Sequence, residues 1–174
     1  MALEEKWERK LPYEPTKLVE KAVVYSDAES HGSVATVVIY QNVIWYQAGM
    51  IPDSITRRLQ PRKTQIVAFE LLAAIMAVLL VAQILPPGVA IHNFIDNKRS
   101  RSCIVKTYSK QWDLNELTGC LWFRCGKLLQ SYWSSYVRSN DNIADAPSRG
   151  KFHAMKLLKA RKIELYFFAA ISSG

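Results

Sequence analysis

The segment 66–85 restricts the fold of this chain more than any other part of the sequence. Its twenty residues include one charged side chain, Glu70, with Gln65 and Gln83 at its edges. Such a segment is long enough to span a bilayer, and it fits equally well the central helix of a helix-on-sheet domain, buried nearly all round. We favour the central helix and expect no membrane span, because the flanking strands and the positions of the other acidic residues require a soluble sheet.

The strands and helices predicted around this segment indicate a single α/β domain. The expected sheet is mixed, with three antiparallel strands followed by two parallel strands, and it is flanked by helices. Gln41 and Asn42 predict a tight hairpin between the second and third strands, and Thr64 is placed to cap the central helix. The expected strands are 22–26, 34–40, 43–49, 89–95 and 132–138; the expected helices are 66–85, 97–108, 113–129 and a basic amphipathic helix at 154–163.

The two ends of the chain differ in composition from this domain, for which we expect the bounds 19–163. Residues 1–18 are polar and charged and are interpreted as an N-terminal arm. Residues 164–174 form an apolar C-terminal tail, either a strand or an interaction segment. The length of 174 residues fits one domain of ordinary size.

The charge balance indicates the class of partner. The formal net charge is +8, from 23 Lys and Arg against 15 Asp and Glu. An excess of this size favours an anionic partner, with nucleic acid ahead of an acidic membrane surface. A basic solvated surface with no such partner is the alternative that charge alone leaves open.

The cysteines and the N-terminus indicate an intracellular location. Cys103, Cys120 and Cys125 form no Cys-x-x-Cys pair and show no zinc-like spacing to histidine. Reduced thiols are therefore expected. The first residues lack the apolar core of a signal peptide and are too acidic for a typical transit peptide. The sequence does not distinguish the nucleus from an organelle such as the mitochondrion.

Four acidic residues lie where the sequence predicts a core. Asp27 and Asp96 each end an apolar strand, Glu70 lies within the central helix, and Asp145 follows the last long strand. A buried carboxylate is costly unless it finds a partner or takes up a proton. Four of them in these positions predict convergence on divalent cations, for which carboxylate oxygens are preferred ligands.

Four segments carry a resemblance to ribonuclease H, in particular to the ribonuclease H domains attached to retroelement reverse transcriptases. They are VVYSDA at 23–28, QIVAFELLA at 65–73, FIDN at 94–97 and NIADAPSR at 142–149. The resemblance covers about residues 20–160, and the segments occur in the family's order.

The resemblance implies a ribonuclease H-like fold and a metal-dependent endonuclease that hydrolyses the RNA strand of RNA–DNA hybrids. It implies that the four acids are catalytic and bind two Mg²⁺ or Mn²⁺ ions, which clamp the scissile phosphate between them. Asp27 would bridge the ions, and Asp145 would hold the ion that activates water. It also suggests nucleic-acid contacts near the acids, from Ser26, Asn97 and Arg149.

Each of these residues also has a structural explanation. Asp27 is compatible with a strand-end turn, Asp96 and Asn97 with a helix cap, and Asp145 with the cap of a short turn. Arg149 is placed to pair with Asp145 instead of nucleic acid. Glu70 is the hardest to explain structurally, because almost no other polar residue surrounds it. The tryptophans Trp112, Trp122 and Trp133 are expected to pack in the core or an interface.

The chain departs from ribonucleases H in two respects, and these leave a second function open. The loop 139–142 lacks the histidine that classical members carry before the last acid, and no basic handle helix is evident. The alternative function is a non-catalytic, RNA-binding subunit of a large ribonucleoprotein, such as an organellar ribosome, docked through the arm and tail. A transposase or integrase relative is a third, minor option.

Overall fold

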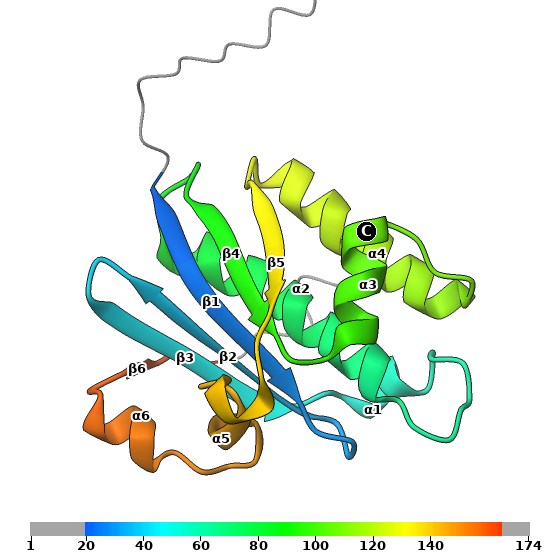
Figure 1. Cartoon of the computed structure of the whole chain (residues 1–174), viewed down its shortest axis with the longest axis horizontal. Coiled ribbons are helices and arrows are strands. Elements are labelled where there is room, and N and C mark those ends of the chain that lie inside the picture. The colour runs from blue at the N-terminus through cyan, green and yellow to red at the C-terminus, as the bar shows by residue number, and fades with distance from the viewer. Residues whose placement is uncertain (1–19, 165–174) are drawn as a thin grey trace, which may run out of the picture.

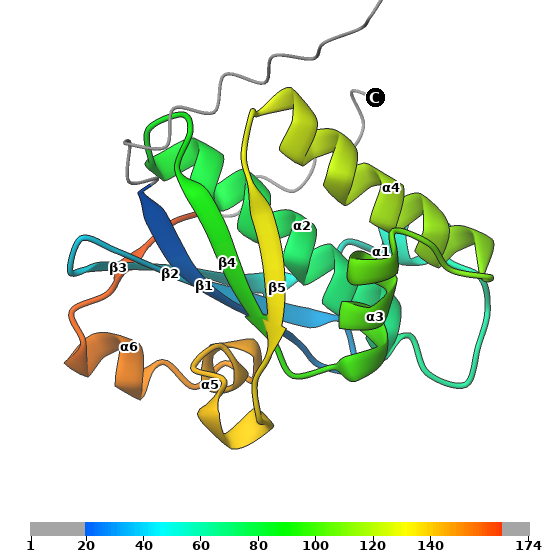
Figure 2. The same cartoon turned by 45° about the horizontal axis from the view of Figure 1, so that its top comes forward.

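The computed structural model describes residues 20–164, in which a six-stranded mixed sheet carries helices on both faces (Figures 1 and 2). The predicted arm 1–18 and the predicted tail beyond Glu164 lie outside the described residues. The strand order is β5-β4-β1-β2-β3-β6. The strands are β1 (Lys21–Ala28), β2 (Ser33–Tyr40), β3 (Val43–Met50), β4 (Ala90–Ile95), β5 (Tyr132–Tyr136) and β6 (Arg161–Lys162).

The predicted fold class is confirmed, with one strand more than expected. Strands β1, β2 and β3 pair antiparallel, and β4 and β5 continue the sheet from β1 in parallel. Gln41 and Asn42 form the predicted hairpin turn, both with positive φ (46° and 63°), which matches the twist of the strands they join. The additional strand is β6, whose two residues pair with the edge of β3.

The helices form two layers. On one face lie α2 (Ile66–Ile84), α3 (Lys98–Lys106) and α4 (Trp112–Lys127), while α1 (Asp53–Thr56) precedes α2. On the other face lie α5 (Asp145–Ser148) and α6 (His153–Leu157), preceded by the short 3-10 helix η1 (Ser139–Asp141). Successive side chains of β1 point to opposite faces of the sheet. Val24 therefore packs toward α2, and Tyr25 packs toward α5 and α6.

Helix α2 is the central helix that the sequence predicted. It is the one described helix with the length and composition of a membrane span, but 14 of its 19 residues are buried. It packs against β1 and β2 on one side and against α4 on the other, so its apolar surface is covered by protein. It begins at Ile66, where the Thr64 hydroxyl accepts a hydrogen bond from the Ile66 N–H (3.3 Å).

The predicted helix at 154–163 is wrong. Helix α6 ends at Leu157, and Lys159 adopts a left-handed conformation (φ 51°) that stops helical growth. Residues 161–162 then pair with β3, so the sheet edge satisfies backbone groups that a helix would have satisfied internally. Leu157 is 71% exposed, and the apolar face of the expected helix therefore has little to pack against.

Two of the three tryptophans are more exposed than predicted. Trp122 packs against the core, and its indole N–H donates to the Ile104 carbonyl (3.2 Å). Trp112 and Trp133 are 54% and 40% exposed. Trp133 continues a row of rings over β4, 4.9 Å from His92 between ring centroids, so neither residue is a core residue in the described structure.

Candidate metal centre

The register of the sheet brings Asp27 and Asp96 to the same end of two neighbouring parallel strands. Strand β1 pairs with β4 so that Tyr25 lies beside Phe94. Asp27 and Asp96 each follow two residues later, Asp27 near the end of β1 and Asp96 directly after β4. Carboxyl ends of adjacent parallel strands are where open α/β sheets place their binding sites.

Glu70 reaches the same point from helix α2. Its side chain is 2% exposed, and its Oε2 atom has no hydrogen-bond partner. Carboxylate oxygens of Asp27, Glu70 and Asp96 lie within 4.8 Å of one another. An unpaired carboxylate oxygen is costly in the interior, so this atom requires either a proton or a cation.

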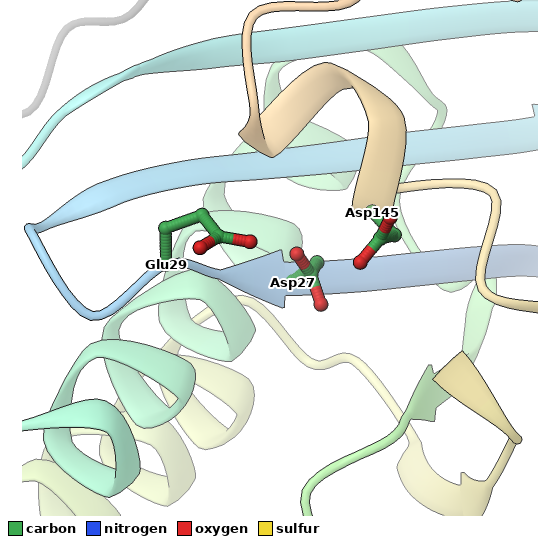
Figure 3. A group of neighbouring side chains, drawn as sticks. All are labelled: Asp27, Glu29 and Asp145. Carbon is green, nitrogen blue, oxygen red and sulfur yellow. The ribbon is translucent and has the colours of Figure 1, made fainter. Parts of the chain in front are cut away.

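A second group of carboxylates shares Asp27 and faces it from the other layer. Asp145 is the first residue of α5, and Glu29 lies in the turn after β1. Figure 3 shows both side chains directed toward Asp27, and oxygens of the three lie within 4.8 Å of one another. All four predicted acids are therefore brought together, and Glu29 is a fifth acid that the sequence did not predict at this site.

Two polar residues from the segment 142–149 hold Asp27 in place. Asn142 Nδ2 donates to Asp27 Oδ1 (3.3 Å) and to the Ser26 carbonyl (3.1 Å). The Ser148 hydroxyl donates to Asp27 Oδ2 (2.5 Å). Both residues are buried. Both belong to the segment NIADAPSR, but their role is not evident from the sequence, because hydrogen-bonding partners more than 100 residues apart leave no local signal.

Burial dominates the electrostatics of Asp27. The pKa of Asp27 is raised from an ordinary 3.8 to about 7, and burial is the largest cause. The Ser148 hydrogen bond opposes the rise, while the charges of Asp96, Asp145 and Glu29 add to it. The carboxyl is therefore about half protonated near neutral pH when no cation is present.

Glu70 is affected in the same direction. Burial raises the pKa of Glu70 well above its ordinary value, and the charges of Asp27 and Asp96 add to the rise. A hydrogen bond from the Ala28 backbone partly opposes the shift. Neighbouring carboxylates that repel one another in this way gain most from a shared cation.

The residues present fit a divalent ion with a preference for oxygen ligands. The donors are carboxylates without a cysteine or histidine among them, as Mg²⁺ or Mn²⁺ requires. The orphaned Oε2 atom of Glu70 supplies an oxygen that a cation would satisfy. The five acids line one cavity of about 320 Å³, large enough for ions and a phosphate group.

The three predicted nucleic-acid contacts differ in their placement. Ser26 is fully buried, and its hydroxyl accepts from Asn93 Nδ2 (2.9 Å), so its side chain does not reach the surface and the predicted contact is corrected. Asn97 lines the cavity and caps α3, accepting from the N–H groups of Arg99 (3.0 Å) and Ser100 (3.1 Å). The cap of α3 is therefore Asn97 and not Asp96, which leaves the Asp96 carboxylate available to the cavity.

Arg149 makes the pairing that the sequence offered as an alternative to nucleic acid. Its Nη2 lies 2.9 Å from Asp145 Oδ1, and its Nε lies 3.0 Å from Glu29 Oε1. The pKa of Arg149 is raised by the hydrogen bond to Asp145 and by the charges of Asp145 and Glu29. Its side chain is half exposed at the mouth of the cavity.

Comparison with known proteins identifies the fold. No protein-family model matches the chain, and no curated protein matches it in sequence. Among solved structures it is similar to ribonuclease H1 of Halobacterium salinarum (19% identity, TM-score 0.53), covering 77% of this chain and 98% of that one. The N-terminal ribonuclease H domain of a Mycobacterium tuberculosis protein gives 17% identity and a TM-score of 0.55, covering 81% and 99%.

A third similar structure, LC11-RNase H1 in complex with an RNA/DNA hybrid, gives 11% identity and a TM-score of 0.52, covering 78% of this chain and 99% of that one. At these identities the similarity lies in the arrangement of strands and helices, which three structures share over nearly their whole length. The described part of the chain therefore has the ribonuclease H fold, with an acidic cavity at the carboxyl ends of β1 and β4.

Proposed function

We propose that this chain is a divalent-metal-dependent endonuclease that hydrolyses the RNA strand of RNA–DNA hybrids. The observation that carries the proposal is the convergence of Asp27, Glu70, Asp96 and Asp145 on one cavity, with a buried, unpaired oxygen on Glu70. A protein gains no stability from unpaired, mutually repelling carboxylates, and metal binding gives them a function.

Each acid contributes differently to such a site. Asp27 belongs to both groups of carboxylates and would contact both ions, while Ser148 and Asn142 fix its orientation. Glu70 and Asp96 would complete the inner group, which is Asp27, Glu70 and Asp96. Asp145 would belong to the outer group, which is Asp27, Glu29 and Asp145. Two divalent ions, when bound, neutralise the charge that develops on a phosphodiester during attack by water. The protein's part is to hold these oxygens in place before the substrate arrives.

The substrate class is supported by three observations of different kinds. The net charge of +8 suits a polyanion. LC11-RNase H1, which shares the fold, was solved with an RNA/DNA hybrid. Asn97 and Arg149 line the cavity and are the candidates for contact with the nucleic-acid backbone. The 3-10 helix η1 stands where classical members carry their histidine, so we expect hydrolysis to proceed without that group.

The test is cleavage of an end-labelled RNA–DNA hybrid by the purified chain in Mg²⁺. We expect the wild type to cut the RNA strand and Asp27→Asn to be slower by about three orders of magnitude or more, as for the loss of a group at the reacting centre. Glu116→Gln on the exposed surface of α4 is the matched control. It removes one carboxylate remote from the cavity and should leave cleavage unchanged.

Two results would contradict the proposal: equal cleavage by wild type and Asp27→Asn, or no cleavage by a wild type that is folded and saturated with metal. In the second case, binding of the hybrid without cleavage would favour the non-catalytic, RNA-binding role. The ribonucleoprotein subunit that the sequence left open is one form of that role.

A further inference from the structure

Arg149 forms ion pairs with two acids of the outer carboxylate group. Its guanidinium lies between Glu29 (3.0 Å) and Asp145 (2.9 Å), and these are two of the three residues in the group Asp27, Glu29 and Asp145. The arginine thus already neutralises two of the three carboxylates that an ion would use there. The inner group differs, because within residues 20–164 Glu70 and Asp96 form no ion pair with lysine or arginine.

The position of Glu29 is fixed by the turn that follows β1. Its backbone N–H donates to the Ser33 carbonyl (2.7 Å), and its carbonyl accepts from the Gly32 N–H (2.9 Å). Gly32 has a φ of +95°, a conformation that favours glycine. This turn presents the Glu29 carboxylate toward Asp27 (Figure 3), so the backbone of the turn positions the third carboxylate of the outer group.

The side chains that line the cavity indicate that it binds a cation in addition to Arg149. Glu70, buried and with an unpaired Oε2, lines the same cavity as Glu29, Asp145 and Arg149. One guanidinium carries a single charge for five carboxylates. Arg149 is also free to leave, since its side chain is half exposed and its only ion pairs within residues 20–164 are those with Glu29 and Asp145.

We propose that Glu29 is an additional ligand of the outer ion and that Arg149 competes with that ion for Glu29 and Asp145. This inference rests on the proposed function and deepens it. The inner ion binds first, between Asp27, Glu70 and Asp96. The outer ion enters when Arg149 swings out, and a nucleic-acid phosphate favours that movement because it offers the guanidinium another anion. Loading of the outer ion is therefore coupled to substrate.

The test is a titration with Mn²⁺ in the absence of nucleic acid, with free Mn²⁺ counted by electron paramagnetic resonance. For the wild type we expect one tight ion and a second that binds at least about tenfold more weakly, a difference of about 1.4 kcal/mol. Arg149→Gln should tighten the second ion by about tenfold, and Glu29→Gln should weaken it by about tenfold, each with a much smaller effect on the first.

Arg57→Gln is the matched control for charge. Arg57 is exposed in the structure and does not line the cavity, so this variant removes one positive charge without opening the outer group. It should bind both ions as the wild type does. If Arg57→Gln tightens the second ion as much as Arg149→Gln, the effect is one of net charge and the competition is disproved.

The remaining outcomes separate this inference from the proposed function. An unchanged or weaker second ion in Arg149→Gln overturns the competition, and equal weakening of both ions in Glu29→Gln overturns the ligand role of Glu29. If the wild type binds no Mn²⁺, the metal centre and this inference fail together. If the wild type binds both ions but cuts no hybrid, the nuclease proposal fails while the ion competition is still decided by the variants.

Discussion

At the scale of single residues, Asp27 has the largest influence on the candidate centre. It is 3% exposed, belongs to both carboxylate groups, and receives hydrogen bonds from Asn142 and Ser148. Burial raises the pKa of this carboxyl to about 7. A metal ligand must be deprotonated, so protons compete with metal for Asp27 throughout the mildly acidic range.

The first residue-scale prediction concerns this competition. Below pH 7, binding of the inner ion must displace a proton from Asp27. The pKa of Glu70 is raised in the same direction, so its proton adds to this competition. Mn²⁺ affinity should therefore rise by about tenfold or more per pH unit between pH 5 and 7, and more slowly above. Calorimetric titrations across this range measure the slope. An affinity that is constant from pH 5 to 7 would show that these carboxyls are already ionised.

The second residue-scale prediction concerns the metal-free protein. Because the folded pKa of Asp27 lies above its ordinary value of 3.8, the folded state binds more protons than the unfolded state between these values. The contribution of Asp27 to the free energy of unfolding is therefore most favourable below about pH 4, and it falls as the pH rises toward 7. Asp27→Asn removes that loss and should raise the free energy of unfolding at pH 8 by about 2 kcal/mol.

Urea denaturation in a chelator at pH 4 and pH 8 measures this effect. The gain from Asp27→Asn should be present at pH 8 and small at pH 4, where the wild-type carboxyl is protonated. Asp53→Asn, an exposed acid on α1, is the control and should change little at either pH. A destabilised Asp27→Asn at pH 8 would mean that the carboxylate is well accommodated in the metal-free fold.

At the scale of elements, a partly buried ion pair between Arg62 and Asp113 connects α4 to the loop that precedes α2. Asp113, 2% exposed, accepts two hydrogen bonds from Arg62 Nη2 (2.6 and 2.7 Å) and one from the Gln60 N–H (3.0 Å). A pair of this kind is costly to break on one side, because the remaining charge stays buried. It fixes the start of α2, four residues before Glu70.

Arg62→Ala should therefore destabilise the protein by about 3 kcal/mol, because it leaves the Asp113 charge without a partner. Replacing both residues, as Arg62→Ala with Asp113→Asn, should recover part of that loss. A double-mutant cycle of unfolding free energies gives the coupling between them. Purely additive losses would show that the two side chains do not act as a pair.

The elements also show which sequence patterns were informative. The apolar runs of α2, β1, β2 and β4 were predicted because each buries most of its residues, those of α2 and β4 in one core cluster and those of β1 and β2 on both faces of the sheet. The structure of the segment 154–163 was not predicted, because its pattern of charged and apolar residues suits a helix. In the fold, Lys159 adopts a left-handed conformation and residues 161–162 pair with the edge of β3. Tertiary pairing of this kind overrides local propensity.

At the scale of the whole molecule, the two helical layers explain why the acids meet. Helix α2 delivers Glu70 from one face of the sheet, α5 delivers Asp145 from the other, and the ends of β1 and β4 lie between them (Figure 1). Asp27, Glu70 and Asp96 were identifiable from sequence because each interrupts or ends an apolar run, and Asp145 was identified from the segment NIADAPSR that resembles ribonuclease H. Glu29 was not, because a glutamate in a turn carries no such contrast.

The supporting residues were beyond reach of the sequence for a different reason. Ser148 and Asn142 contact Asp27 across more than 100 residues, and only the folded chain brings them together. Ser26 shows the converse: it is adjacent to Asp27 in sequence, but the alternation of β1 directs it to the opposite face. Position along the chain therefore identified the four acids that the structure brings to one cavity, but only some of the residues around them.

Anomalous X-ray diffraction from crystals equilibrated with Mn²⁺ tests the central claim, a divalent-metal centre built from these acids, most directly. We predict a strong anomalous peak bounded by Asp27, Glu70 and Asp96, within about 2–2.6 Å of their carboxylate oxygens as for hard cations, and its loss in Asp27→Asn. No peak in this cavity at saturating Mn²⁺, or one retained in Asp27→Asn crystals, would contradict the account.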